Sequence, residues 1–277
     1  MTDKKNATNT DQEAEEIEER SVEEAAALSP KLIYEVVRKD GEEEMSRPTL
    51  SLIWSGIAAG IMISFSVLGE AVFRTHLPEG PSRFLIENLG YTFGFLLVIL
   101  GRMQLFTENT ITSVLPLMSE PGFAKLRAVG RLWGIVLCAN VVGAYAAALM
   151  IAFTPAVPAD LIPAITDLSA HAMGMSPSDG FARAIPAGVL VAAIVWMMPQ
   201  AEEASFFVIL VFTWLIAAGD FAHIVAGSVE MAFLHVTGAL SLYDAVFGFF
   251  IPVLLGNIIG GTVIFAMMAW GQVKEEL

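Results

Sequence analysis

Asp220-Phe-Ala-His-Ile-Val-Ala-Gly227 decides the fold, because this polar stretch interrupts a segment that is otherwise apolar. Ala204–Gly219 before it holds 16 uncharged residues, and a weaker apolar stretch continues after it to about Leu240. A helix that crosses the hydrocarbon core needs ~20 apolar residues, so neither part is long enough alone. The pattern predicts a membrane span that is broken near its middle, with His223 at the break.

A second broken span is predicted earlier in the chain. Asn88–Gly101 is apolar, Arg102-Met-Gln-Leu-Phe-Thr-Glu-Asn109 interrupts it, and Thr110–Met118 resumes. Irregular backbone at membrane depth persists only where it is buried in protein or lines a cavity. We therefore expect both breaks to lie along a permeation path.

Four further apolar blocks are long enough to span a bilayer. They are Leu50–Gly69, Leu132–Phe153, Ala184–Met198 with its apolar flanks, and Ala245–Trp270. The hydrophobic fraction of 55% and the mean hydropathy of +0.65 exceed those of an ordinary soluble domain. The sequence thus predicts an all-α membrane protein with six spans, of which the second and fifth are broken.

Short internal similarities indicate a repeat. Ala139-Asn-Val-Val-Gly-Ala144 matches Gly256-Asn-Ile-Ile-Gly-Gly261 at an offset of 117, and the breaks, taken from Thr107 to His223, match at 116. Gly56 onward resembles Ala184 onward at an offset of 128, which a longer loop after the third span would absorb. Each half has three spans, and an odd number of spans means that the second half starts on the opposite side of the membrane. The second half is therefore expected to be inverted, as in transporters and channels whose site lies between the halves.

The ends of the chain are expected to differ from its middle. The first 46 residues hold 14 of the 29 acidic residues and read as a largely disordered cytoplasmic tail, with a possible short helix from Ser29-Pro30 to Arg38. Residues 47–273 form the expected channel domain and 274–277 a cytoplasmic end. With both termini inside, eleven Lys and Arg face the cytoplasm and three face outward, which predicts a multi-pass inner-membrane protein of that orientation.

His223 is the first candidate site residue, because an ionisable group at the break of a span indicates an ion or proton pathway. The alternative is that His223 has a structural role and forms hydrogen bonds with the backbone carbonyls of the unwound segment. Thr107, in the other break, can donate and accept hydrogen bonds to a histidine or a substrate. Asn140 and Asn257 are mid-span amides. We interpret Asn140 as a residue that hydrogen-bonds between helices, whereas Asn257 either does the same or belongs to the permeation site.

Two further groups surround the first break. Leu105 and Phe106 are either a dry constriction or plain packing. Buried charges need partners, so we expect Arg102 to pair with Asp220 or Glu230. No nucleophile–base arrangement, phosphate loop or haem motif is visible, so neither an enzyme nor a cofactor is predicted.

These residues resemble the motifs of the formate/nitrite transporter family over about residues 47–271. Four segments carry the resemblance: Leu105-Phe-Thr-Glu-Asn109, Phe221-Ala-His-Ile-Val-Ala226, Leu255-Gly-Asn-Ile-Ile-Gly-Gly261 and Phe181-Ala-Arg183. The resemblance implies an aquaporin-like fold of six helices in two inverted repeats, assembled as a homopentamer with one pore per protomer.

The resemblance also implies roles for single residues. Leu105 and Phe106 would line the cytoplasmic constriction, His223 would be the central histidine with Thr107 and Asn257 as partners, and Arg183 would attract anions on the outer face. Four positions depart from the family pattern. They are Ala222 for glutamate, Gly227 for asparagine, Ile216 for a constriction phenylalanine, and Arg102 for glycine.

The predicted function is a passive or proton-linked channel for small monovalent anions such as formate or nitrite. A neutral acid crosses a low-dielectric waist far more easily than its anion, so His223 is expected to stabilise or protonate the anion there. One alternative is a channel for small neutral solutes in which His223 is structural. Another is a cation or metal transporter, because Asp220 and His223 lie three residues apart.

Overall fold

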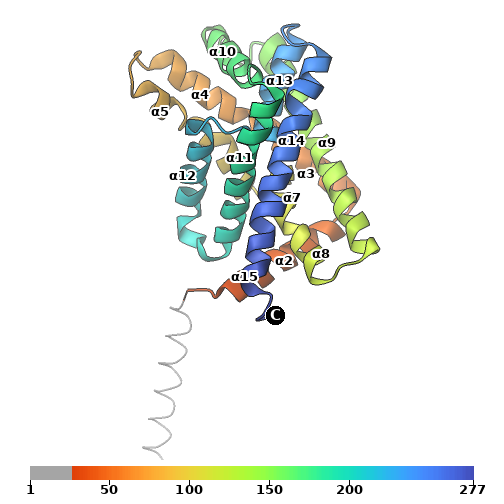
Figure 1. The fold of residues 1–277 in the computed structure, drawn as a ribbon. Coiled ribbons are helices and arrows are strands. Elements are labelled where there is room, and N and C mark those ends of the chain that lie inside the picture. Colours follow the sequence, from red (N-terminus) through yellow and green to blue (C-terminus); the bar gives the residue numbers. More distant parts are fainter. Residues whose placement is uncertain (1–26) are drawn as a thin grey trace, which may run out of the picture.

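The computed structural model describes residues 27–277. The expected acidic tail up to residue 26 lies outside this range. The described residues form helices joined by short connections (Figure 1). The first half contains α2 (Pro30–Ser46), α3 (Thr49–Met62), α4 (Ser64–His76), α5 (Arg83–Glu87), α6 (Thr92–Leu100), α7 (Phe106–Thr112), α8 (Val114–Ser119) and α9 (Phe123–Phe153).

The second half follows a connection that contains η1 (Ala159–Leu161) and α10 (Ile162–Met173). It consists of α11 (Pro177–Met197), η2 (Met198–Gln200), η3 (Glu202–Ala204), α12 (Ser205–Ala218), α13 (Ile224–Val236), η4 (Asp244–Phe250), α14 (Ile251–Ile258), η5 (Ile259–Ala266) and α15 (Met267–Val273). Helix α10 does not explain the offset of 128, because it adds equally to every offset between the two halves. The offset falls from 128 at Gly56 and Ala184 to 118 at Arg102 and Asp220, so the extra residues lie in the first half before its break, in the stretch that contains α4 and α5, and not after the third span as predicted.

Five helical stretches are long and apolar enough to cross a membrane. They are Thr49–His76, Arg83–Leu100, Phe123–Phe153, Pro177–Gln200 and Asp244–Val273. The second was predicted to be too short on one side of its break, but α5 extends it to 18 residues. Helices α12 and α13 are shorter apolar helices, with 14 and 13 residues, and stand where the broken fifth span was predicted.

Each break contains one residue with left-handed backbone. Arg102 has φ 49° and Asp220 has φ 53°, and they are the two non-glycine residues with positive φ in the described part of the chain. Such a conformation costs an L-residue roughly 1–2 kcal/mol, so it must be held by the surrounding structure. Leu105 and His223 then stand in extended conformation immediately before α7 and α13.

The register between the two breaks is 118, not the predicted 116. Arg102 corresponds to Asp220, and Leu105 corresponds to His223. The sequence comparison went wrong because it aligned two polar side chains, Thr107 and His223, whereas the backbone aligns the residues that end each break. Thr107 therefore lies in the first turn of its helix, two residues after Leu105, while His223 caps its own.

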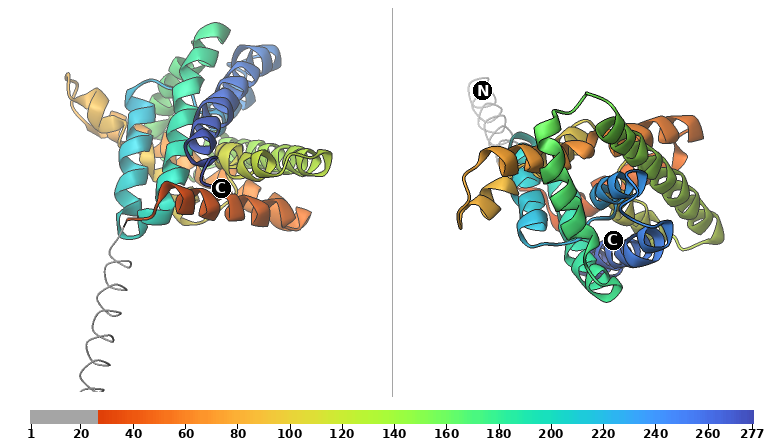
Figure 2. Two further views of the ribbon diagram at one scale, coloured as in Figure 1. Left: turned by 60° about the horizontal axis from the view of Figure 1, so that its bottom comes forward. Right: turned by 90° about the horizontal axis from the view of Figure 1, so that it is seen from above.

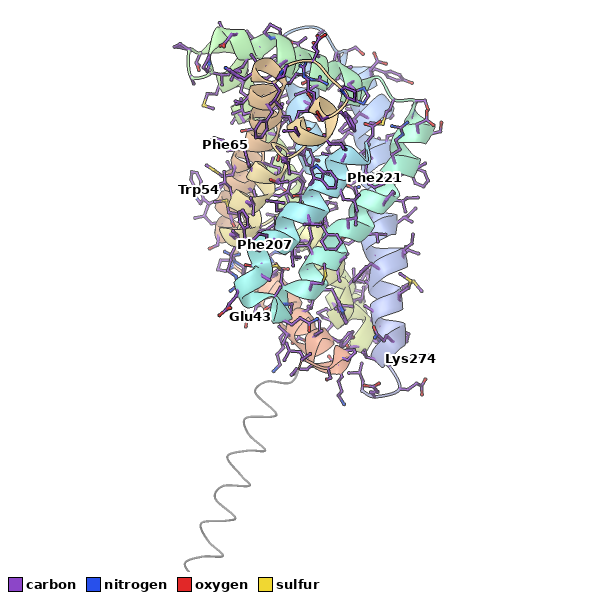
Figure 3. All side chains as sticks on the ribbon, turned by 90° about the vertical axis from the view of Figure 1, so that its left-hand side faces the viewer. Glu43, Trp54, Phe65, Phe207, Phe221 and Lys274 are labelled. Atoms are coloured by element: carbon purple, nitrogen blue, oxygen red, sulfur yellow. The ribbon has the colours of Figure 1, made fainter. Side chains whose placement is uncertain are left out.

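Two ends of the molecule can be distinguished in Figure 1, where α5 and α10 lie at the top and α2, α8 and α15 at the bottom. We call these the α10 face and the α2 face. The left view in Figure 2 brings the α2 face toward the reader, and the right view shows the α10 face from above. The long helices run between the two faces. Exposed apolar side chains such as Trp54 and Phe207 cover the belt between the faces (Figure 3).

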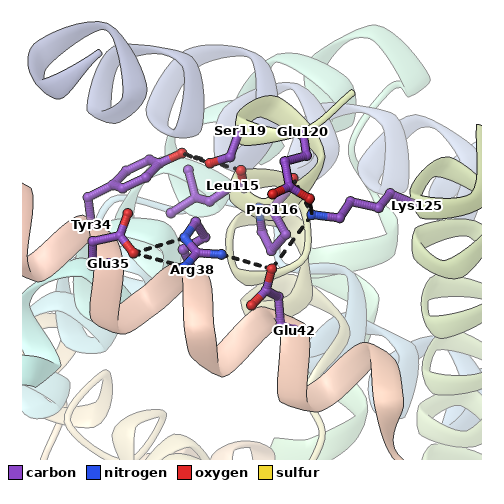
Figure 4. A network of polar contacts seen from close by, with 9 residues as sticks. All are labelled: Tyr34, Glu35, Arg38, Glu42, Leu115, Pro116, Ser119, Glu120 and Lys125. Carbon is purple, nitrogen blue, oxygen red and sulfur yellow. Dashed lines mark hydrogen bonds and ion pairs between the residues drawn. The ribbon is translucent and has the colours of Figure 1, made fainter. Parts of the chain in front are cut away.

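Helix α2 packs against the folded body, although it lies in the stretch up to residue 46 that was expected to be a largely disordered tail with a short helix. It begins where expected, with the Ser29 side chain accepting a hydrogen bond from Leu32 N, but it continues to Ser46 and buries Tyr34 and Gly41. An ionic network joins it to the α8–α9 region (Figure 4): Arg38 with Glu35 and Glu42, and Lys125 with Glu42 and Glu120.

Candidate functional site

His223 is the N-cap residue of α13 and is 2% exposed. Its Nδ1 accepts a hydrogen bond from the Ala226 backbone N–H at 3.2 Å. A ring nitrogen that accepts carries no proton, so this bond selects the neutral imidazole with its proton on Nε2. The partial positive charge at the start of a helix also disfavours an imidazolium at this position.

Thr107 completes the pair that joins the two breaks. Its Oγ1 lies 2.8 Å from His223 Nε2, and its side chain is fully buried in the first turn of α7. Because Nε2 carries the proton, the imidazole donates and the Thr107 hydroxyl oxygen accepts. The hydroxyl proton is then available to a third group at this position.

Phe95 packs against the histidine ring, a contact that sequence reasoning missed. The two ring centroids are 4.9 Å apart in an edge-to-face arrangement, and Phe95 is fully buried on α6. One aromatic residue within an apolar span gives no signal of such a role. The contact fixes the ring plane, so the Nε2–H points toward Thr107 in a preset direction.

Asn140 and Asn257 hold the breaks in place from the neighbouring long spans. Asn140 Oδ1 accepts from Phe106 N at 2.9 Å, and its Nδ2 donates to the carbonyls of Gly56 and Gln104. Asn257 repeats the pattern, accepting from Ile224 N at 2.8 Å and donating to the carbonyls of Ala184 and Ala222. Unpaired backbone groups at membrane depth cost several kcal/mol each, so these amides stabilise both breaks.

Asn257 thus acts through the backbone and does not face the cavity described next. Its side chain is fully buried, and both amide atoms are bonded to protein. The interpretation of Asn140 as a helix-contact residue applies to Asn257 as well.

A cavity of about 270 Å³ lies on the α10 side of His223. It is lined by residues from α4, α5, α10, α13 and η4, and by the second break, including Glu70, Arg74, Glu87, Tyr91, His171, Asp220, Ala222, His223, Gly227, Glu230 and Phe249. The imidazole therefore borders a cavity rather than lipid. Thr107 does not line this cavity, so the Thr107–His223 contact lies at its inner limit.

Gly227 and Phe249 form one wall of this cavity. A Cβ on Gly227 would lie 2.3 Å from the Phe249 ring, closer than real contacts allow. Phe249 stands in η4, a π-helical turn that the sequence does not reveal, and is 6% exposed. The ring thus takes the space that a side chain at position 227 would fill.

The other predicted constriction residues are buried. Leu105 and Ile216 are fully buried, and Phe106 is 1% exposed. The Phe106 ring contacts Trp133 edge-to-face at 5.6 Å, and Ile216 lies in the core outside the cavity lining. The roles of Leu105 and Phe106 in a constriction remain predictions.

Comparisons with known proteins show the family to which the chain belongs. The family profile described as "Formate/nitrite transporter" matches residues 31–271. The chain belongs to the formate/nitrite transporter family. It is 44% identical over 245 residues to the inner membrane protein YfdC of Escherichia coli K12, covering 88% of this chain and 79% of YfdC.

Further members of the formate/nitrite transporter family are more distant. The formate channel FocA of Haemophilus influenzae is 26% identical over 243 residues, covering 78% of this chain and 84% of FocA. A solved pentameric formate channel with formate bound superposes with a TM-score of 0.69 at 23% identity, covering 82% of this chain and 98% of that one. A solved FNT family ion channel gives a TM-score of 0.72 at 18% identity, with coverages of 87% and 98%. These superpositions show the shared all-helical fold.

The charges around the cavity pair differently from the prediction. Asp220 contacts Arg183 and, at 2.9 Å, His171 on the α10 face, so it is not the partner of Arg102. Arg102 is exposed at the other break, at the α2 end of α6, and no ion pair of the described residues joins it to Glu230. The predicted pairing is wrong because the two breaks turn their left-handed residues toward opposite faces.

This pairing changes the expectation for Arg183. Its guanidinium is half exposed beside the Asp220 carboxylate, so the charge of one balances the charge of the other. Attraction of anions by Arg183 remains a prediction.

Proposed function

We propose that this chain is an inner-membrane channel for a small monovalent anion of a weak acid, with formate and nitrite as reference substrates. The observation that carries the proposal is the buried His223, which borders a cavity on one side and bonds to Thr107 on the other. Membership of the formate/nitrite transporter family and the similarity to FocA support the substrate class.

The proposed role of His223 is to stabilise the substrate as a neutral imidazole. The Nε2–H of His223 is a hydrogen-bond donor, and the Thr107 hydroxyl can donate or accept. Both groups lie where the carboxylate or nitrite oxygens would pass. The N-terminus of α13 adds a positive field that favours an anion at this point. Crossing the apolar region beyond, toward Leu105 and Phe106, is easiest as the neutral acid, because an isolated charge in a low dielectric costs many kcal/mol.

The proposed orientation places the α2 face in the cytoplasm. The distribution of Lys and Arg favours this arrangement, since eleven face the cytoplasm and three face outward. The pentameric formate channel that shares this fold supports a homopentamer with one passage per protomer. Exposed apolar residues between the two faces, among them Trp54 and Val142, would then contact lipid or neighbouring protomers.

The proposal is tested by anion uptake into proteoliposomes with the His223→Asn variant. Asparagine is a favoured N-cap, so the variant keeps a side-chain acceptor for α13 while it lacks the imidazole. We expect formate and nitrite uptake to fall at least about tenfold, a loss of 1.4 kcal/mol or more. The control is His76→Asn, because His76 is exposed on the α10 face. Wild-type uptake in the His223→Asn variant would reject the proposed role.

One observation favours a second candidate, a channel for neutral solutes. Both ring nitrogens of His223 are bonded to protein, which is what a purely structural histidine would show. Stopped-flow swelling of proteoliposomes with urea and glycerol distinguishes the two, because only the neutral-solute channel predicts rapid swelling that is independent of pH. A cation site at Asp220 and His223 has less support, since Asp220 is bonded to Arg183 and His171.

A further inference from the structure

We propose that Glu70 and Glu230 form a proton-loading site on the α10 side of His223, from which a permeating anion takes its proton. This inference rests on the proposed function and names the group that supplies the proton. It assigns the task to two carboxyl groups that are far apart in the sequence and line the cavity described above.

The two residues enter the cavity from different helices. Glu230 stands on α13, seven residues after His223 and three after Gly227, so the three share one face of the helix. Glu70 stands on α4, which packs against α13, and it is only 6% exposed. Both line the same cavity as His223 and Tyr91.

The other acidic groups of the cavity already have basic partners. Glu87 is bonded to Arg74 at 2.9 Å and approaches Arg83 at 3.3 Å. Asp220 is bonded to Arg183 and His171. Within the described residues, no hydrogen bond or ion pair engages the carboxyl group of Glu70 or of Glu230. The pair is therefore the unneutralised acidic charge of this cavity.

Two unpaired carboxylates that line one cavity repel each other when both are ionised. Like charges that share a site favour a state in which the pair holds a proton. Several titratable or charged groups face the pair from the surrounding elements: Arg74, Glu87, Tyr91, His171, Asp220 and His223. The two basic side chains in this set, Arg74 and His171, are bonded to Glu87 and Asp220.

Protonation of Glu70 and Glu230 would also remove the negative charge that opposes the entry of an anion. Two ionised carboxylates between the α10 face and His223 would repel an incoming anion, whereas a protonated pair would admit it. The neutral His223 holds its only proton toward Thr107 and is poorly placed to give it up. Ala222, beside His223, offers no carboxyl group, so the unpaired carboxyl groups of this cavity are those of Glu70 and Glu230.

The transfer is balanced. The O–H bond of the protonated carboxyl breaks, its electron pair stays on the carboxylate, and the proton bonds to an oxygen of formate or nitrite. The neutral acid continues past His223, and water on the α10 face reprotonates the pair. Among the described residues no group of three His, Cys, Asp or Glu side chains is arranged to hold a metal ion, so a proton is the ligand favoured here.

The test uses Glu70→Gln, Glu230→Gln and the double variant in the full chain. Glutamine keeps the size of the side chain and cannot release a proton in this pH range. The control is Glu79→Gln, whose side chain is 96% exposed and does not line this cavity. Proteoliposomes that contain a pH-sensitive dye report formate uptake and proton movement together, and infrared difference spectra report protonated carboxyl groups without any need for transport.

We expect wild-type protein at neutral pH to show a protonated carboxyl band that the double variant lacks. We also expect the double variant to lose the increase of formate uptake on acidification, with uptake at acid pH reduced about tenfold, while Glu79→Gln behaves as wild type. A double variant with the wild-type pH profile, or a wild type without the band, would overturn the inference.

Two other results have defined meanings. If wild type transports neither formate nor nitrite but shows the carboxyl band, the proposed function is wrong. The proposed transfer of a proton to a permeating anion is then wrong as well. If calorimetry finds stoichiometric Mn²⁺ or Zn²⁺ binding that the double variant loses, the pair is a cation site and the proton-loading inference is overturned.

Discussion

The hydrogen bond between Thr107 and His223 joins two side chains 116 residues apart at the meeting point of two broken spans. Its geometry depends on the Ala226 N–H, which fixes the tautomer, and on Phe95, which fixes the ring. None of the four groups is unusual alone. Their combination places one imidazole N–H in a defined direction inside the membrane.

At this scale, Thr107→Val should lower formate uptake while Thr107→Ser retains most of it. Valine has the shape of threonine without the acceptor, so His223 Nε2–H loses its partner at a cost of about 1–3 kcal/mol. Uptake and melting temperature measured on the same preparations check this. Equal uptake by the valine and serine variants would show that the hydroxyl is not needed.

Gly227→Ala should destabilise the protein and narrow the cavity, because the new methyl group meets the Phe249 ring. Overpacking of this kind typically costs 1–3 kcal/mol. Gly134→Ala is the matched control, since nothing lies within 4 Å of a Cβ there. A melting temperature of Gly227→Ala equal to that of Gly134→Ala would contradict the packing described for Phe249.

At the scale of elements, the asparagines of α9 and α14 explain why both breaks are stable. Each amide satisfies one N–H and one carbonyl that a break leaves unpaired. It also donates to a carbonyl of α3 or α11, which links the break to that helix. Helix α2 is the second important element. Its Glu44 carboxyl accepts hydrogen bonds from Thr112, Gln104 and Asn109, so it ties the first break and the following helix to the α2 face.

Gly41→Ala should weaken the packing of α2. A Cβ at this position would lie 1.8 Å from the Thr112 carbonyl oxygen, so the helix must move outward or tilt. Hydrogen exchange of residues 30–46 should rise by tenfold or more relative to wild type, as expected for a loss above about 1.4 kcal/mol. Gly130→Ala, which meets no neighbour, should leave exchange unchanged.

The Glu44 carboxyl also predicts a pH dependence. Burial raises the pKa of Glu44, and the three hydrogen bonds offset part of that rise. A raised pKa means that the packed helix binds the proton more tightly than the unpacked one, so packing is strongest below the ordinary value of 4.5 and weakens as pH rises through the raised value. The melting temperature of Glu44→Gln relative to wild type should therefore increase over this range. A constant difference across pH would contradict the prediction.

At the scale of the whole molecule, the apolar blocks and their two interruptions were enough to predict the all-helical membrane fold, and the resemblance of four short motifs predicted the family. Hydropathy and short motifs are local signals, and the spans are local features. The pairing of Asp220 with Arg183 and His171 could not be predicted, because it depends on which way each left-handed turn directs its side chain. The packing of α2 was missed because Tyr34 and Gly41 stand among acidic residues that suggest a solvated tail.

The same limit applies to the cavity. His223 and Thr107 were identified by their place in the breaks, but Phe95, Phe249 and Glu70 lie in stretches that read as ordinary spans. Only the three-dimensional arrangement brings Glu70 to the face of α13 that carries His223.

Assembly is a further property of the whole molecule. The protein in mild detergent or nanodiscs should have the mass of five protomers, which native mass spectrometry can measure. A monomeric or dimeric mass that persists across lipid compositions would contradict the proposed pentamer.

The central claim is that a neutral His223, with its proton on Nε2 and shared with Thr107, borders the passage that the substrate takes. The most direct test is nitrogen NMR of ¹⁵N-histidine protein in lipid, with His76, His171 and His235 replaced so that one ring remains. We predict one protonated and one unprotonated ring nitrogen at neutral pH, and a shift of the Nε2 resonance when formate or nitrite is added. A doubly protonated ring, or a resonance that saturating anion leaves unmoved, would contradict the account.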